Sequence, residues 1–86
     1  MILFYDTIIN VTAIKKLKEK LRRGSKLSCQ EVRRILGEMG YSLARQKGSH
    51  EQWIKQGRTF TLACHKKEAP YYILDALKKI LEESDG

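Results

Sequence analysis

Ser28-Cys-Gln-Glu-Val-Arg-Arg-Ile-Leu-Gly-Glu-Met-Gly40 is the clearest helix signal in this chain of 86 residues. Ser28 and Glu31 have the Ser-x-x-Glu spacing of a capping box, in which each side chain accepts a hydrogen bond from the other residue's backbone N–H. Gly40 is placed to end the helix in a left-handed conformation. Four apolar residues follow the i, i+3, i+4, i+7 rule for one buried helix face, namely Val32, Ile35, Leu36 and Met39.

Three short strands are expected after this helix, at Tyr41 to Gln46, Glu51 to Lys55 and Arg58 to Cys64. Lys47-Gly48-Ser49 suits a turn or bulge, and Gln56-Gly57 suits a tight hairpin turn. The third strand alternates most clearly, with Phe60, Leu62 and Cys64 on one side and Thr59, Thr61 and Ala63 on the other. The short turns predict antiparallel pairing.

A second amphipathic helix is expected to close the domain. Pro70 suits the first turn of a helix, and Ile73, Leu77 and Ile80 form an apolar stripe after it. One of the two tyrosines that open this helix, Tyr71 and Tyr72, is expected to pack inward. The predicted fold class is α+β with the order αβββα, in which both helices cover one face of the sheet and leave the other face free.

Residues 1–26 precede this domain and are expected to form a basic helical extension, with the domain itself at residues 27–86. Ile14, Leu17 and Leu21 fall on one side of a helix expected over 11–23, and six lysines and arginines surround them. The extension is either an arm that docks RNA or protein, or a helix whose apolar stripe packs on the domain or on a second copy. We favour packing, and a third interpretation makes the leading segment incidental.

Charge is unevenly distributed along the chain. The net charge is +7 and the isoelectric point is about 9.6. Residues 1–26 carry +5 and residues 41–69 carry +4, whereas residues 70–86 carry −2. This pattern favours an anionic partner for the central segment.

The two cysteines, Cys29 and Cys64, lie far apart in sequence and show no framework of spacings. We therefore expect reduced thiols in a cytoplasmic protein. No zinc-ligand spacing involves them, and we expect no metal and no cofactor. No apolar run approaches the ~20 residues that a membrane span needs, and residues 2–9 are interrupted by Asp6. We expect no membrane partner and no secretion.

Arg45-Gln-Lys-Gly-Ser-His-Glu51 contains the main candidate for chemistry. His50 follows a glycine turn, with basic residues on the same approach. A histidine side chain both takes and gives a proton near neutral pH, and neighbouring cations can hold phosphates. This combination is what a small RNA-cleaving enzyme needs.

From Leu27 to about Glu83 the chain resembles the HicA mRNA interferase toxins of bacterial toxin–antitoxin pairs. The resemblance consists of the capped helix, the Gly40-Tyr41 entry to the first strand and the segment Arg45-Gln-Lys-Gly-Ser-His50. It continues through the strand Thr59–Ala63, His65 after it and the closing helix. The resemblance implies a double-stranded-RNA-binding-like fold, cleavage of mRNA, neutralisation by a HicB-like antitoxin and a catalytic role for His50. Self-association is left open.

The implied reaction is attack of an RNA 2′-hydroxyl on the adjacent phosphodiester, with His50 as general base or acid. Lys47, with Arg45 or Lys55 if they point the same way, would offset charge on the phosphate. The second proton-transfer partner is open between His65, water and the substrate. For His65 we favour a structural or RNA-contacting role. The candidate RNA-binding residues are Arg45, Lys47, Ser49, Lys55, Arg58, Lys66 and Lys67.

Two aromatic residues have two possible roles each, and the chain has three possible functions. Trp53 and Tyr41 either stack on unpaired bases or pack in the core, and packing is the commoner fate of such a tryptophan. The function is either that of an endoribonuclease or that of a non-catalytic RNA-binding module of the same fold. A third candidate is an interaction protein whose basic face docks an acidic partner.

Overall fold

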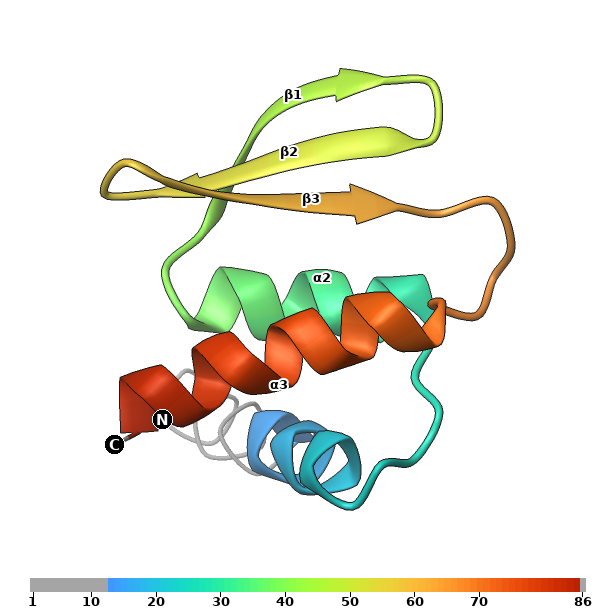
Figure 1. The fold of residues 1–86 in the computed structure, drawn as a ribbon, viewed down its shortest axis with the longest axis vertical. Helices are drawn as coiled ribbons and strands as arrows, with labels where there is room; N and C mark the ends of the chain where they lie inside the picture. The colour runs from blue at the N-terminus through green and yellow to red at the C-terminus, as the bar shows by residue number, and fades with distance from the viewer. Residues whose placement is uncertain (1–12, 86) are drawn as a thin grey trace, which may run out of the picture.

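The computed structural model describes residues 13–85, and Figure 1 shows an α+β fold. Residues 13–22 are helical, and they are followed by the elements of the predicted domain. These are α2 (Cys29–Glu38), β1 (Ser42–Lys47), β2 (His50–Lys55), β3 (Arg58–Ala63) and α3 (Tyr71–Asp85). The predicted fold class and the order αβββα are confirmed. Residues 1–12 lie outside the described part, and with them the run at 2–9 and the start of the helix expected over 11–23.

α2 begins and ends as its sequence predicts. The Ser28 hydroxyl accepts from the Glu31 backbone N–H at 3.1 Å, and the Glu31 carboxylate accepts from the Ser28 backbone N–H at 2.9 Å. Gly40 follows the C-terminal cap with a φ of +96°, a conformation that a side chain disfavours. Both ends of the helix are therefore set by local sequence.

The strands form one antiparallel sheet in the order β1-β2-β3. A two-residue turn joins β2 to β3, and its residues Gln56 and Gly57 have φ values of +46° and +81°. Two positive φ angles match the right-handed twist of a tight hairpin. Most of the observed strand ends differ from the predicted ends by one residue, and the others coincide with them.

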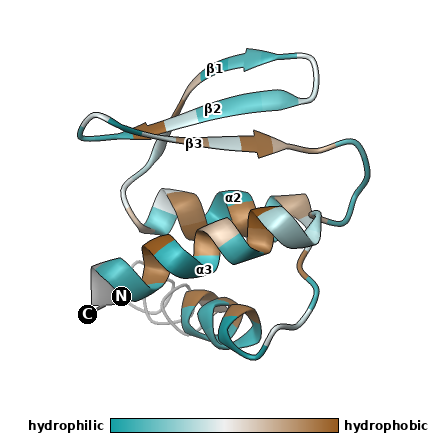
Figure 2. Ribbon diagram, in the orientation of Figure 1, coloured by the Kyte–Doolittle hydropathy of each residue, from teal (hydrophilic) through white to brown (hydrophobic). Residues whose placement is uncertain are grey.

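The helices α2 and α3 lie against one face of the sheet, and no helix in the described part covers the other face (Figure 1). Phe60 and Leu62 of β3 are buried toward the helices, while Thr59 and Thr61 are exposed. The alternation predicted for β3 is thus confirmed. Figure 2 shows β1 and β2 as mainly hydrophilic strands; every side chain of β1 is exposed, whereas β2 also contains buried and half-buried residues.

The N-terminal helix lies on the side of α2 and α3 away from the sheet (Figure 1). Ile14, Leu17 and Leu21 are buried in the same apolar cluster as the core of the domain. Lys20 Nζ lies 3.5 Å from Glu31 Oε2 and ties this helix to the start of α2. The apolar stripe therefore packs on the domain, as we favoured.

The expectation that one of the two tyrosines at the start of α3 packs inward is wrong. Tyr71 and Tyr72 are 79% and 52% exposed, so neither packs inward at the start of α3. Tyr41 is buried, and the Lys55 ammonium lies 5.9 Å from the centroid of its ring. Of the two alternatives for Tyr41, the structure thus shows packing in the core. Trp53 also packs against the core, as expected of a tryptophan on a sheet.

The expectation of reduced thiols is also wrong, because Cys29 and Cys64 form a disulfide. Cys29 is the first residue of α2, and Cys64 directly follows β3. The fold brings their Cα atoms to 6.4 Å, within the range that a disulfide requires. Their separation of 35 residues gave no sign of this proximity.

Between residues 13 and 85, no helix has both the length and the apolar character to span a membrane.

Candidate nucleic-acid-cleaving site

His50 is the first residue of the central strand β2, where it is exposed. It pairs with Lys47 of β1 on one side and with Ala63 of β3 on the other. Successive side chains of a strand point to opposite faces, and Glu51 is buried on the helix-covered face. The His50 ring therefore belongs to the uncovered face of the sheet.

A bulge in β1 places two cations on the same face as His50. Leu43 pairs with Trp53 and Arg45 pairs with Gln52, so one extra residue of β1 lies between these pairs. Without this extra residue, the alternation would turn Arg45 toward the helix-covered face. With it, Arg45 and Lys47 both face the side of His50.

These side chains line one hollow on the uncovered face. Its lining residues are Arg45, Lys47, His50 and Gln52, and its volume is about 530 Å³. Two cations, an imidazole and an amide give a surface suited to a phosphodiester, because cations and N–H donors offset anionic charge. Sequence analysis named Arg45, Lys47 and His50, and the structure brings these three together.

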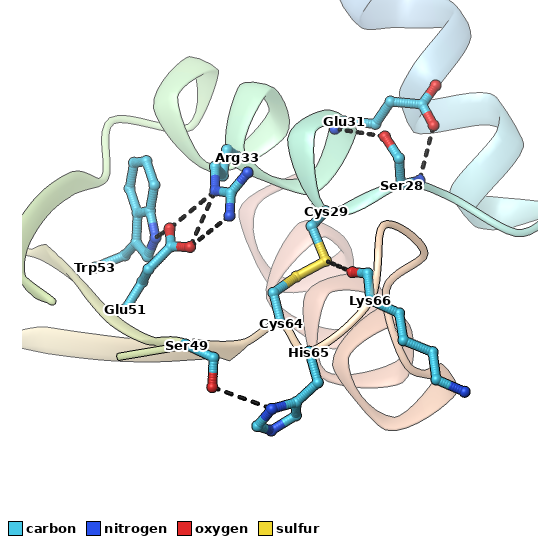
Figure 3. The surroundings of a disulfide bond; sticks show 10 residues. All are labelled: Ser28, Cys29, Glu31, Arg33, Ser49, Glu51, Trp53, Cys64, His65 and Lys66. Carbon is cyan, nitrogen blue, oxygen red and sulfur yellow. Dashed lines mark hydrogen bonds and ion pairs between the residues drawn. A yellow bond between two sulfur atoms is a disulfide. The ribbon is translucent and has the colours of Figure 1, made fainter. Parts of the chain in front are cut away.

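His65 approaches His50 from the loop after β3. The two imidazole ring centroids are 6.0 Å apart, and the rings are inclined at 77° in an edge-to-face arrangement. Nδ1 of His65 lies 3.2 Å from the Ser49 hydroxyl, as Figure 3 shows. Ser49 is therefore part of the site through its contact with His65.

The loop that carries His65 is fixed to two other parts of the domain. The backbone N–H of Cys64 donates to the Ser49 carbonyl at 3.0 Å, which joins it to the β1–β2 turn. The N–H of Cys29 donates to the Lys67 carbonyl at 2.8 Å, and that of Ala69 to the Leu27 carbonyl at 2.9 Å. The disulfide adds a covalent link, with Cys29 Sγ 3.4 Å from the Lys66 carbonyl oxygen (Figure 3).

A part-buried ion pair lies on the face of β2 opposite to His50, where Glu51 is buried and the Arg33 side chain is 39% exposed. Arg33 of α2 donates to both carboxylate oxygens of Glu51, with its shortest contact at 2.6 Å, and Trp53 Nε1 donates to the same carboxylate at 3.1 Å. The hydrogen bonds from Arg33 are the main cause that lowers the pKa of Glu51 below its ordinary range, against the opposing effect of burial. The same contact raises the pKa of Arg33. This network, drawn in Figure 3, anchors the strand that presents His50 to α2.

The other predicted RNA-binding residues are more dispersed. Lys66 and Lys67 are exposed on the same loop as His65. Lys55 lies over the Tyr41 ring at the opposite end of β2 from His50. Arg58 Nη1 lies 3.4 Å from the Glu83 carboxylate of α3. Of the two cations considered as helpers to Lys47, Arg45 thus lines the hollow and Lys55 does not.

A second hollow lies next to His65. Its lining includes Lys26, His65, Lys66, Tyr71 and Tyr72. Across residues 13–85, the structure contains no group of three or more histidine, cysteine or acidic side chains arranged to hold a metal ion.

Sequence reasoning missed two features of this region. The first is the Arg33–Glu51 ion pair, whose two residues lie 18 positions apart in the chain. The second is the proximity of His50, at the start of β2, to His65, which follows the end of β3. The antiparallel hairpin itself was a usable signal for the second feature, because it returns the end of β3 to the start of β2.

A comparison with protein-family models finds a match over residues 29–84, to the model described as the HicA toxin of bacterial toxin–antitoxin systems. Neither the comparison with curated proteins nor that with solved structures gives a match. The matched segment contains α2, the whole sheet and nearly all of α3, together with both histidines. The residues before α2 lie outside it.

Proposed function

Because the chain belongs to the HicA family of bacterial toxins, we propose that it is an endoribonuclease that cleaves mRNA and is neutralised by a HicB-like antitoxin. The observation that supports the reaction most directly is the exposed imidazole of His50 in one hollow with Arg45 and Lys47. An mRNA substrate places its action in the cytoplasm.

In the proposed reaction, the 2′-hydroxyl of a ribose attacks the neighbouring phosphodiester. His50 takes part as general base or general acid, a role typically contributing about 10²–10⁴-fold to the rate. Arg45 and Lys47 stabilise the charge that builds on the phosphate oxygens. The reaction requires no metal ion, since the nucleophile belongs to the substrate. Lys66 and Lys67 extend the basic surface along the RNA.

The test is the His50→Ala variant. Because His50 is exposed at a strand start, its loss leaves the core intact, and the variant should fold normally. We expect RNA cleavage to fall about 10²–10⁴-fold and growth arrest in an expressing host to disappear. A defined RNA incubated with purified protein, with and without a chelator, measures the first effect.

Thr59→Ala is the matched control, because Thr59 is exposed on the same sheet face at the far end of the hairpin. Its cleavage rate should equal that of the wild type. A His50→Ala protein that folds and still cleaves would contradict the assignment. RNA binding that weakens with salt, persists in His50→Ala and gives no cleavage products with the wild type would instead indicate a non-catalytic RNA-binding module.

Inhibition by the antitoxin is tested separately. Co-expression with a HicB-like antitoxin should restore growth and protect the RNA. Unchanged toxicity in the presence of that protein, folded and at equal expression, would contradict the proposed partner.

A further inference from the structure

We propose that His65 is the second proton-transfer group of this site and protonates the leaving 5′-oxygen of the cleaved RNA. This inference rests on the proposed ribonuclease function and assigns the partner that His50 needs. It also replaces the structural or RNA-contacting role that the sequence favoured for His65.

The first argument is the distance between the rings. One side chain must take the proton of the attacking 2′-hydroxyl and another must give a proton to the leaving 5′-oxygen. Both side chains must therefore reach the same phosphodiester. A proton-transfer contact spans about 2.6–3.2 Å between heavy atoms, and the two ring centroids are only 6.0 Å apart. A phosphodiester lying over the pair is within reach of both rings. Both side chains are exposed, so that RNA has access to them.

The second argument is the contact with Ser49. A serine hydroxyl can donate or accept, so it suits the His65 ring in either protonation state. When the ring is protonated, Nδ1–H donates to the Ser49 oxygen, 3.2 Å away. Nε2–H is then the donor left for the substrate. Ser49 acts as a positioning residue, since it fixes which nitrogen of the ring is available.

The third argument is the anchoring of the loop. The N–H of Cys64, next to His65 in the chain, donates to the carbonyl of Ser49 at 3.0 Å. Ser49 is in turn the residue before His50. The same short backbone link therefore holds both histidines, and their separation is set by the β-sheet rather than by the substrate. Such preorganisation is what proton transfer by two groups requires.

The step balances without a further reactant. The 2′-oxygen forms a bond to phosphorus and gives its proton to neutral His50. The bond between phosphorus and the 5′-oxygen breaks, and the 5′-oxygen takes a proton from His65. The products are a 2′,3′-cyclic phosphate and a 5′-hydroxyl. His50 then returns its proton to solvent and His65 regains one, which restores the starting state.

The experiment compares two RNA substrates that differ in the leaving atom. One has the natural 5′-oxygen, and the other has a sulfur in its place, which leaves as a thiolate without being protonated. For His65→Ala we expect a loss of about 10²–10⁴-fold on the oxygen substrate and a rate near that of the wild type on the sulfur substrate. His50→Ala should be slow on both substrates.

His65→Asn is the second variant, because its amide can keep a hydrogen bond to Ser49 but cannot transfer a proton. It should behave like His65→Ala. The wild type should show a bell-shaped pH dependence of kcat/KM, and both variants should lose its alkaline limb, because only His65 must be protonated to act. Far-ultraviolet circular dichroism checks the fold of each variant.

The outcomes separate this inference from the proposed function. If the wild type cleaves RNA and His50→Ala does not, but His65→Ala keeps the full rate, His65 is not a proton donor and the ribonuclease function stands. Equal losses on the two substrates, or restored activity in His65→Asn, would show a structural role and overturn the inference. A wild type that cleaves neither substrate overturns both.

Discussion

Glu51 is the charged side chain that the fold buries most deeply in the described part of the chain, at 3% exposure. Its neighbour in sequence, His50, is exposed on the opposite face of the same strand. Glu51 thus fixes the strand to α2 through Arg33, and His50, the residue before it, lines the hollow with Arg45 and Lys47. The motif around position 50 pointed to the histidine because its chemistry is local. It did not point to the ion pair, because the partner Arg33 lies on another element.

The Glu51 carboxylate makes stability depend on acid pH. Its pKa is lower in the folded protein than its ordinary value of 4.5, mainly because of the hydrogen bonds from Arg33. A lowered pKa in the folded state stabilises the fold above pH 4.5, and this contribution is lost as pH falls through the folded value. We expect the free energy of unfolding, measured with urea, to decrease as pH falls below 4.5.

Glu51→Gln tests the source of that dependence. The variant cannot lose a proton, so its stability at neutral pH should be lower and its decrease in acid should be shallower. Glu31 also has a lowered pKa, from its bond to the Ser28 backbone, and Glu31→Gln serves as the comparison. An acid dependence in Glu51→Gln as steep as in the wild type would contradict the assignment.

At the scale of elements, α2 was predictable to within a residue because its signals are contained in it. The capping box and the terminal glycine each act over a single turn, and the apolar spacing extends over about two turns. β1 was less predictable, because its bulge depends on pairing with β2. Alternation alone indicated a regular strand, and a regular strand would have turned Arg45 away from His50.

Ser28→Ala tests the contribution of the cap. The change removes the hydroxyl that accepts from the Glu31 N–H and frees the start of α2. Loss of such a cap typically costs about 0.5–2 kcal/mol of folding stability. We expect urea denaturation to give a decrease in that range. Ser25→Ala, in the connection before the cap, should change stability much less, and equal effects of the two substitutions would contradict this account of the helix start.

At the scale of the whole molecule, the layers of the fold were predictable from the sequence, but the covalent link between them was not. Both helices cover one face of the sheet because their apolar stripes must be buried. The N-terminal helix joins them through Ile14, Leu17 and Leu21. The disulfide depends on where α2 and β3 meet in space, and two isolated cysteines in sequence carry no such information.

The disulfide closes a loop of 35 residues, and we expect it to stabilise the fold by about 3–4 kcal/mol, mainly by restricting the unfolded chain. A reducing agent should lower the midpoint of urea denaturation accordingly. In the double variant with Cys29→Ala and Cys64→Ala, the midpoint should be low and insensitive to the reducing agent. Equal midpoints for the wild type with and without reductant would contradict this prediction. The experiment also measures how stable the protein is once its disulfide is reduced.

The way in which the loop from Cys64 to Ala69 is held affects which mutations it can accept during evolution. Apart from the disulfide, the contact of Cys29 Sγ with the Lys66 carbonyl and the hydrogen bond between Ser49 and His65, its bonds to α2 and to the β1–β2 turn join backbone to backbone. Every amino acid but proline supplies the same N–H and carbonyl groups. Mutations at positions 65–68 can therefore exchange one reactive or charged group for another without rerouting the chain. Substitutions in this loop can therefore change the reactivity of the surface while the backbone fold stays the same.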